Sequence, residues 1–103
     1  MLQHVTAEHF RALKGSQCVL QLSDGSQLPI AISAIDEKPL ARLSDNQRLP
    51  FSVSLDSLAP SDFVDGLCSI DLPELGRLEE VFVSRVPPMG RDANLAYYCI
   101  SFN

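Results

Sequence analysis

Apolar and polar residues alternate along several short segments of this chain. In 51–55, phenylalanine, valine and leucine are separated by serines, and 68–72 repeats the pattern with cysteine, isoleucine and leucine. In 96–102, alanine, tyrosine, isoleucine and phenylalanine stand at every second position. Because neighbouring side chains of a strand point to opposite faces, this period predicts strands with one buried and one solvent-facing side. Such strands are typical of antiparallel sheets, so the pattern predicts an all-β fold.

The clearest local signal is a β-hairpin formed by 17–23 and 26–35. Both segments carry apolar residues at every second position, and Asp24-Gly25 between them can adopt the positive φ angles of a tight turn. Pro29 in the second segment has no N–H to donate to a neighbouring strand. We therefore expect the second strand to lie at an edge of the sheet or to contain a bulge at Pro29.

A short helix is predicted before the hairpin. Thr6 can cap its N-terminus, and Gly15 can adopt the left-handed conformation that ends many helices. Val5 and Phe10 have the spacing of a hydrophobic staple, which fixes how the chain enters the helix. Because a helix this short is marginal in isolation, we expect it to pack on the sheet.

The rest of the chain supplies the remaining strands and three irregular connections. The alternation fails over 36–48, 57–65 and 87–94, where turn-forming residues collect. The segment 77–86 contains the apolar run Val81-Phe82-Val83, which predicts either a central strand covered on both faces or a bulged strand. We expect an antiparallel, barrel-like or curved sheet of about six strands, with the helix packed over one end.

Size and charge narrow the classes of partner. The chain has 103 residues, of which 46% are hydrophobic, so it can bury a core as a single domain over residues 1–103. Eight Lys and Arg against 13 Asp and Glu give a net charge of −5, and the basic residues are scattered, so we expect no nucleic-acid partner. No apolar run approaches the length of a signal h-region or a membrane span, so we expect a cytoplasmic protein without membrane contact.

The residues that could perform chemistry are dispersed. Cys18, Cys68 and Cys99 are widely separated, which is typical of small buried hydrophobes rather than of a disulfide framework or a CxxC site. His4 and His9 match neither the HExxH nor the HxxEH spacing of metalloproteases.

The acidic pair Glu79-Glu80 is similarly unpromising as a general acid and base. Adjacent strand residues point to opposite faces, so this pair is more typical of solvated charge that protects a sheet from edge pairing. No serine lies in a GxSxG motif, and the glycines are isolated. We therefore expect no catalytic residues, no metal site, no cofactor and no enzymatic activity.

The long connections supply the candidate binding residues. Phe63, Met89 and Arg91 are apolar or guanidinium side chains in irregular segments, where a fold has less need of them than in a strand. A local turn contact between Arg91 and Asp92 is the alternative for the arginine. If these residues bind a partner, Arg91→Glu with Met89→Ser weakens that binding and leaves folding nearly intact.

We expect a non-enzymatic protein-binding or assembly module, with an unidentified protein partner and with the Pro29 edge strand as a route to a homo-oligomer. A small-ligand-binding β-barrel or an enzyme accessory subunit is the alternative.

Several short motifs occur in an order that resembles a family of short bacterial proteins of unknown function. The motifs extend nearly from end to end: 6–10 (TAEHF), 50–52 (PFS), Gly66, 73–76 (PELG), 90–93 (GRDA) and the aromatic ending 98–103. Relatives tend to have tyrosine at the position of Cys68 and histidine at that of Leu72. The resemblance implies a compact single domain and supplies no chemistry. Because some relatives occur beside tail-fibre-like or secretion-associated proteins, it implies an adaptor or assembly role.

Overall fold

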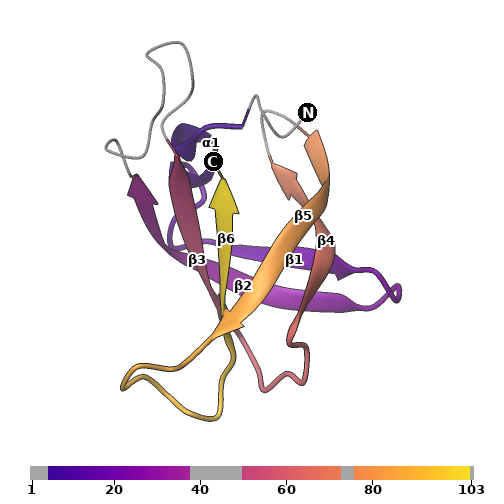
Figure 1. Ribbon diagram of the computed structural model, residues 1–103, viewed down its shortest axis with the longest axis vertical. Helices are drawn as coiled ribbons and strands as arrows, with labels where there is room; N and C mark the ends of the chain where they lie inside the picture. Colours follow the sequence, from indigo (N-terminus) through magenta and orange to yellow (C-terminus); the bar gives the residue numbers. More distant parts are fainter. Residues whose placement is uncertain (1–4, 38–49, 73–75, 103) are drawn as a thin grey trace.

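The structure is a computed structural model that describes residues 5–37, 50–72 and 76–102. Its strands form a closed antiparallel barrel in the order β1-β2-β3-β6-β5-β4, with one short helix near the N-terminus (Figure 1). This confirms the predicted all-β fold of about six strands. The elements in chain order are α1 (Ala7–Arg11), β1 (Gln17–Leu22), β2 (Gln27–Glu37), β3 (Phe51–Ser57), β4 (Asp65–Leu72), β5 (Gly76–Val86) and β6 (Tyr97–Phe102).

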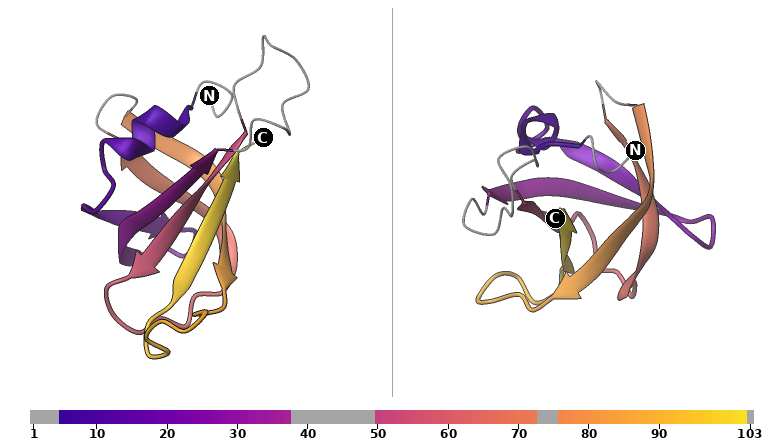
Figure 2. Two further views of the ribbon diagram at one scale, coloured as in Figure 1. Left: turned by 90° about the vertical axis from the view of Figure 1, so that its left-hand side faces the viewer. Right: turned by 45° about the horizontal axis from the view of Figure 1, so that its top comes forward.

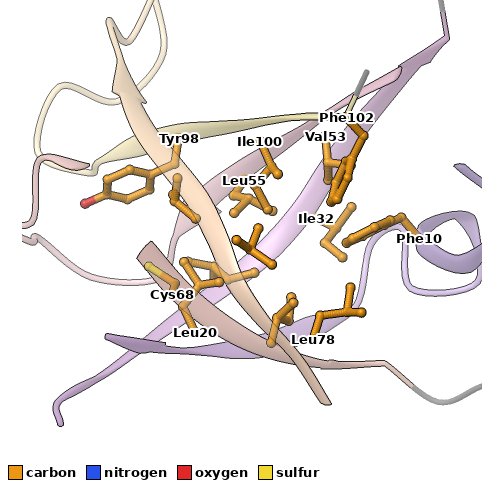
Figure 3. Close-up of a cluster of buried hydrophobic side chains, with 14 of the residues drawn as sticks. Phe10, Leu20, Ile32, Val53, Leu55, Cys68, Leu78, Tyr98, Ile100 and Phe102 are labelled. Atoms are coloured by element: carbon orange, nitrogen blue, oxygen red, sulfur yellow. The ribbon is translucent and has the colours of Figure 1, made fainter. Parts of the chain in front are cut away.

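Alternate residues of the strands point into the barrel and form one hydrophobic core. On β3, Phe51, Val53 and Leu55 are buried, while the serines between them are half-buried on the outer side. Figure 3 shows side chains from different strands and from α1 meeting inside the barrel. Full burial of one such side chain contributes about 1.5–3 kcal/mol. The barrel interior is therefore a packed core.

The predicted hairpin is confirmed. β1 and β2 pair antiparallel, with Leu20 opposite Leu28. The hydroxyl and the backbone N–H of Ser26 donate to Oδ1 of Asp24 at 2.5 and 2.9 Å, and these hydrogen bonds lower the pKa of the Asp24 carboxyl. Gly25 has a φ of 90°, which a residue without a side chain adopts readily.

β2 is not an edge strand, so the expectation for Pro29 is wrong. β2 pairs with β1 on one side and with β3 on the other, and its bulge lies at Ser33. The Pro29 carbonyl accepts a hydrogen bond from Leu58 N at 3.3 Å, so this side of Pro29 faces the chain just after Ser57, the last residue of β3. Proline is tolerated here because its missing N–H falls beyond the end of the neighbouring strand.

Helix α1 covers one end of the barrel (Figure 2). Phe10 points from the helix into the core, with ring centroids 6.1 Å from Phe51 and 5.5 Å from Phe102. Val5, the other residue of the predicted staple, is also fully buried. The helix is thus anchored by packing rather than by its own length, as expected for so short an element.

Two predicted connections lie largely outside the described residues. β2 extends through Glu37, and the remainder of the connection predicted over 36–48 is outside the described ranges. The motif at 73–76, where we expect β4 to turn into the next strand, is likewise outside them, apart from Gly76, where β5 begins.

Candidate functional site

Two large apolar side chains face outward on the wall formed by β4 and β5. Leu67 and Phe82 lie directly opposite each other in the antiparallel pairing, and they are 51% and 55% exposed. Their strand neighbours Cys68, Val81 and Val83 are buried in the core, which fixes the direction of the two side chains. We refer to Leu67 and Phe82 together as the outer pair.

A β-bulge in β5 places Phe82 on the outside. Cys68 pairs with Val81 but Ile70 pairs with Leu78, so Ser69 of β4 lies opposite two residues, Glu79 and Glu80. Simple alternation from the buried Leu78 would send Phe82 inward, and the extra residue reverses that parity. This confirms the bulged alternative for the apolar run at 81–83.

The bulge borders a surface hollow next to the outer pair. The hollow has a volume of about 250 Å³, and Gln21, Ser69, Glu79, Glu80 and Leu67 are among its lining residues. Arg77 also lines it, and its Nε lies 3.6 Å from Oε1 of Glu79. The site therefore combines an apolar platform with a polar, mainly acidic recess.

Acidic groups stand at both ends of the outer pair. Glu79 and Glu80 lie next to it at the bulge. Asp65 lies at its other end, opposite Ser84. All three carboxylates belong to exposed residues. Around the outer pair these three carboxylates outnumber the nearby cation Arg77, in keeping with the net charge of −5.

Phe63, one of the predicted binding residues, closes the barrel end opposite α1. Its ring lies 5.6 Å from that of Tyr98, and its carbonyl oxygen accepts the Tyr98 hydroxyl at 2.8 Å. Gly66 has a φ of 153°, and a Cβ there would stand 3.6 Å from the Phe63 ring. Phe63 is half-buried against the core, so packing alone accounts for its presence.

Arg91, the second predicted residue, contacts its own loop, β6 and β3. Its guanidinium carbon stands 3.9 Å from the centroid of the Tyr97 ring, and Nε donates to Pro88 O at 2.7 Å. Nη1 lies 3.4 Å from Oδ1 of Asp56 on β3. The acidic partner of Arg91 is therefore Asp56 and not the adjacent Asp92.

Met89, the third predicted residue, is 81% exposed. It has a φ of 54°, in the left-handed backbone region that residues other than glycine rarely adopt. The structure thus places Met89 on the surface and gives Phe63 and Arg91 intramolecular partners. None of the three belongs to the outer pair, which lies on the barrel wall rather than in a loop.

Sequence reasoning missed the outer pair for a physical reason. The apolar run at 81–83 signalled that one of its residues would face away from the core, but only the bulge decides which one. The outward position of Leu67 was harder to predict from the sequence. The alternation in this segment starts at Cys68, one residue after Leu67.

A second hollow of about 450 Å³ lies where β1 meets the end of β4 and the residues after α1. Its lining includes Leu13, Val19 and Leu72 together with Gln17 and Cys18. Burial raises the pKa of the Cys18 thiol. A thiol that stays protonated is a weak nucleophile, so this residue is poorly suited to covalent chemistry.

Three further observations on the described residues concern metal binding, the histidines and membrane-spanning helices. No group of three His, Cys, Asp or Glu within them could hold a metal ion. His4 lies outside the described ranges, and Nδ1 of His9 accepts a hydrogen bond from Thr6 N at 2.9 Å at the start of α1. Among these same residues, no helix combines the length and apolar character needed to cross a membrane.

Comparison with known proteins gives one match. The model of a family described as Domain of unknown function (DUF6916) matches residues 5–102, which is nearly the whole chain. No curated protein and no solved structure matches it.

Proposed function

We propose that this chain, which belongs to the DUF6916 family of domains of unknown function, is a non-enzymatic protein-binding or assembly module. The observation that carries the proposal is the outer pair, Leu67 and Phe82, held half-exposed on two rigid strands. Large apolar side chains exposed next to one another are typical of surfaces that a partner covers. A strand pair also presents them with little loss of conformational entropy on binding.

The interior of the barrel supports the same interpretation. Its core is filled by apolar side chains, and Phe10 and Phe63 pack at opposite ends. A ligand inside the barrel would have to displace these side chains at a cost of several kcal/mol. Binding through the outer wall requires no such rearrangement.

The cysteine thiols favour a non-enzymatic role as well. Burial raises the pKa of both Cys18 and Cys68, and this lowers the population of the nucleophilic thiolate. The carboxylates of Glu79 and Glu80 are exposed to solvent, where a general acid–base pair gains little from its surroundings.

A capture experiment in the native host tests the proposal. Tagged wild-type protein is compared with the variant Leu67→Thr/Phe82→Thr, which retains β propensity, and with the matched control Val19→Thr/Leu58→Thr, which changes exposed apolar residues elsewhere. We expect a stoichiometric protein partner with the wild type and with the control, and its loss with the outer-pair variant. Equal recovery with all three proteins would remove the outer pair from the proposal.

The 450 Å³ hollow supports a second candidate, a small-ligand-binding or enzyme accessory role. Its volume lies within the range of about 300–1,000 Å³ that is usual for ligand sites, and its lining mixes apolar and amide side chains. Native mass spectrometry of protein purified from the host checks this candidate. A bound small molecule that is lost on Leu13→Gln would favour it over the protein-binding module.

A further inference from the structure

The hollow beside the outer pair has the size of a site for one side chain. Its volume of about 250 Å³ is below the roughly 300 Å³ at which small-molecule pockets begin. Leu67 belongs both to the outer pair and to the lining of the hollow. A chain that lays an apolar side chain on the outer pair therefore brings its next residues directly over the hollow.

The charge of the hollow selects the kind of side chain. Glu79 and Glu80 contribute two carboxylates, and the nearby cation Arg77 lies 3.6 Å from one of them. Within the described ranges, no cation forms an ion pair with Glu80. Gln21 and Ser69 add further hydrogen-bond acceptors. A guanidinium or ammonium group complements this lining, whereas a carboxylate would be repelled.

The backbone at Glu80 is strained. Its φ of 58° lies in the left-handed region, which a residue other than glycine rarely adopts. Such conformations cluster at binding and catalytic sites. Glycine at this position would form the bulge with less strain than Glu80 does.

A second copy of this chain fits the surface poorly. A two-fold contact through the outer pair would bring together the Asp65, Glu79 and Glu80 carboxylates of both copies. Like charges that face each other across an interface are unfavourable, and the net charge of −5 on each copy adds to the repulsion.

We propose that the outer pair and the adjacent hollow bind a partner segment in which an arginine or lysine stands next to an apolar residue. The apolar side chain covers Leu67 and Phe82, and the basic side chain lays its aliphatic stem along Leu67 with its charged group between Glu79 and Glu80. This inference rests on the proposed function and specifies the chemistry of the partner.

Fluorescence anisotropy with defined peptides tests the inference. The probes are labelled hexapeptides that alternate arginine with leucine or, as a matched control, glutamine with leucine. They are titrated with the full chain and with the variant Glu79→Gln/Glu80→Gln. A second variant, Glu8→Gln/Asp62→Asn, removes the same charge from exposed residues of α1 and of the connection between β3 and β4.

We expect the arginine peptide to bind the wild type more tightly than the glutamine peptide does. Glu79→Gln/Glu80→Gln should lower the affinity for the arginine peptide about fivefold. This is the loss expected when two exposed ion pairs of about 0.5 kcal/mol each are removed. Glu8→Gln/Asp62→Asn should change its affinity less than twofold. Equal weakening by both variants, equal affinity of both peptides, or no binding of the arginine peptide would overturn the inference.

The same variants separate this inference from the proposed function. If the partner captured in the host is lost with Leu67→Thr/Phe82→Thr but binds Glu79→Gln/Glu80→Gln unchanged, the basic residue is wrong and the protein-binding module stands. If neither variant affects capture, both proposals fail at this surface. A dimer at neutral pH that depends on Leu67 and Phe82, measured by sedimentation, would make a second copy the occupant and overturn the inference.

Discussion

Arg91 and Met89 stand two positions apart in one loop, but the fold uses them differently. Arg91 stacks on Tyr97, donates to Pro88 O and pairs with Asp56, whereas the Met89 side chain extends into solvent. A substitution at Arg91 therefore removes several contacts at once, and one at Met89 removes few.

We expect Arg91→Glu to lower the free energy of unfolding by about 1–2 kcal/mol, because it loses the contact with Tyr97 and places a carboxylate near Asp56. Met89→Ser should change it by less than about 0.5 kcal/mol. Urea denaturation of the two single variants measures both values. Equal stability of the two variants would show that the Arg91 contacts contribute little. The partner affinities of Arg91→Glu and Met89→Ser should be compared at a temperature where both variants are folded.

Glu80 gives the second prediction at this scale. Its φ of 58° suits glycine, which avoids the steric cost of about 1–2 kcal/mol but loses about 0.5–1 kcal/mol through the entropy of the unfolded chain. We expect Glu80→Gly to raise the free energy of unfolding by about 0.5–1 kcal/mol, measured by urea denaturation. Glu80→Ala, which keeps the strain, should be near neutral, and Glu79→Gly should be destabilising. A loss of stability in Glu80→Gly would mean that the carboxylate itself supports the bulge.

At the scale of elements, local sequence patterns correctly predicted those strands and turns whose formation depends on residues close together in the sequence. The alternation in β3 and the turn at Asp24-Gly25 are such patterns, and both elements form as expected. The Pro29 prediction failed because barrel closure depends on which strands meet in space. Pro29 of β2 lies beside the chain just after the end of β3, so it needs no sheet edge.

The candidate site was harder to predict for the same reason. The outer position of Phe82 follows from the register between β4 and β5, which a single strand does not encode. The contacts of Phe63 with Tyr98 and of Arg91 with Asp56 join segments far apart in the sequence, so loop residues acquired structural roles that composition alone did not reveal.

Helix α1 shows how an element depends on a single anchor. Phe10 packs against the stacked rings of Phe51 and Phe102, and alanine favours helix formation more than phenylalanine does. Phe10→Ala therefore removes core packing without weakening the helix itself, and we expect a loss of about 3–5 kcal/mol in the free energy of unfolding. Arg11→Ala is the matched control: its ion pairs with Glu8 and Glu37 are exposed and screened by solvent, so the loss in the free energy of unfolding should be far smaller than for Phe10→Ala. Similar losses in both variants, measured by urea denaturation, would show that packing of the helix does not anchor it.

At the scale of the whole molecule, the exposed side chains on the barrel wall offer one route to association. Each described strand pairs with a neighbour on both sides, although β5 pairs with β6 only over Ser84–Val86. The outer pair is an exposed apolar feature on the wall of β4 and β5, and we expect its flanking carboxylates to keep two copies apart at neutral pH.

Charge and exposed apolar surface together make self-association depend on pH. The net charge is −5 at pH 7 and vanishes near the isoelectric point of about 4.7, so the repulsion between copies that carry Asp65, Glu79 and Glu80 beside the outer pair is weakest there. We expect sedimentation velocity to show a monomer at pH 7 and reversible association near pH 4.7, because the repulsion between copies is then lost while the outer pair stays exposed. Phe82→Thr should suppress the association, and Met89→Ser, which changes a more exposed apolar residue far from these carboxylates, should not. A wild type that stays monomeric near pH 4.7, or equal suppression by both variants, would contradict the view that these carboxylates protect the outer pair.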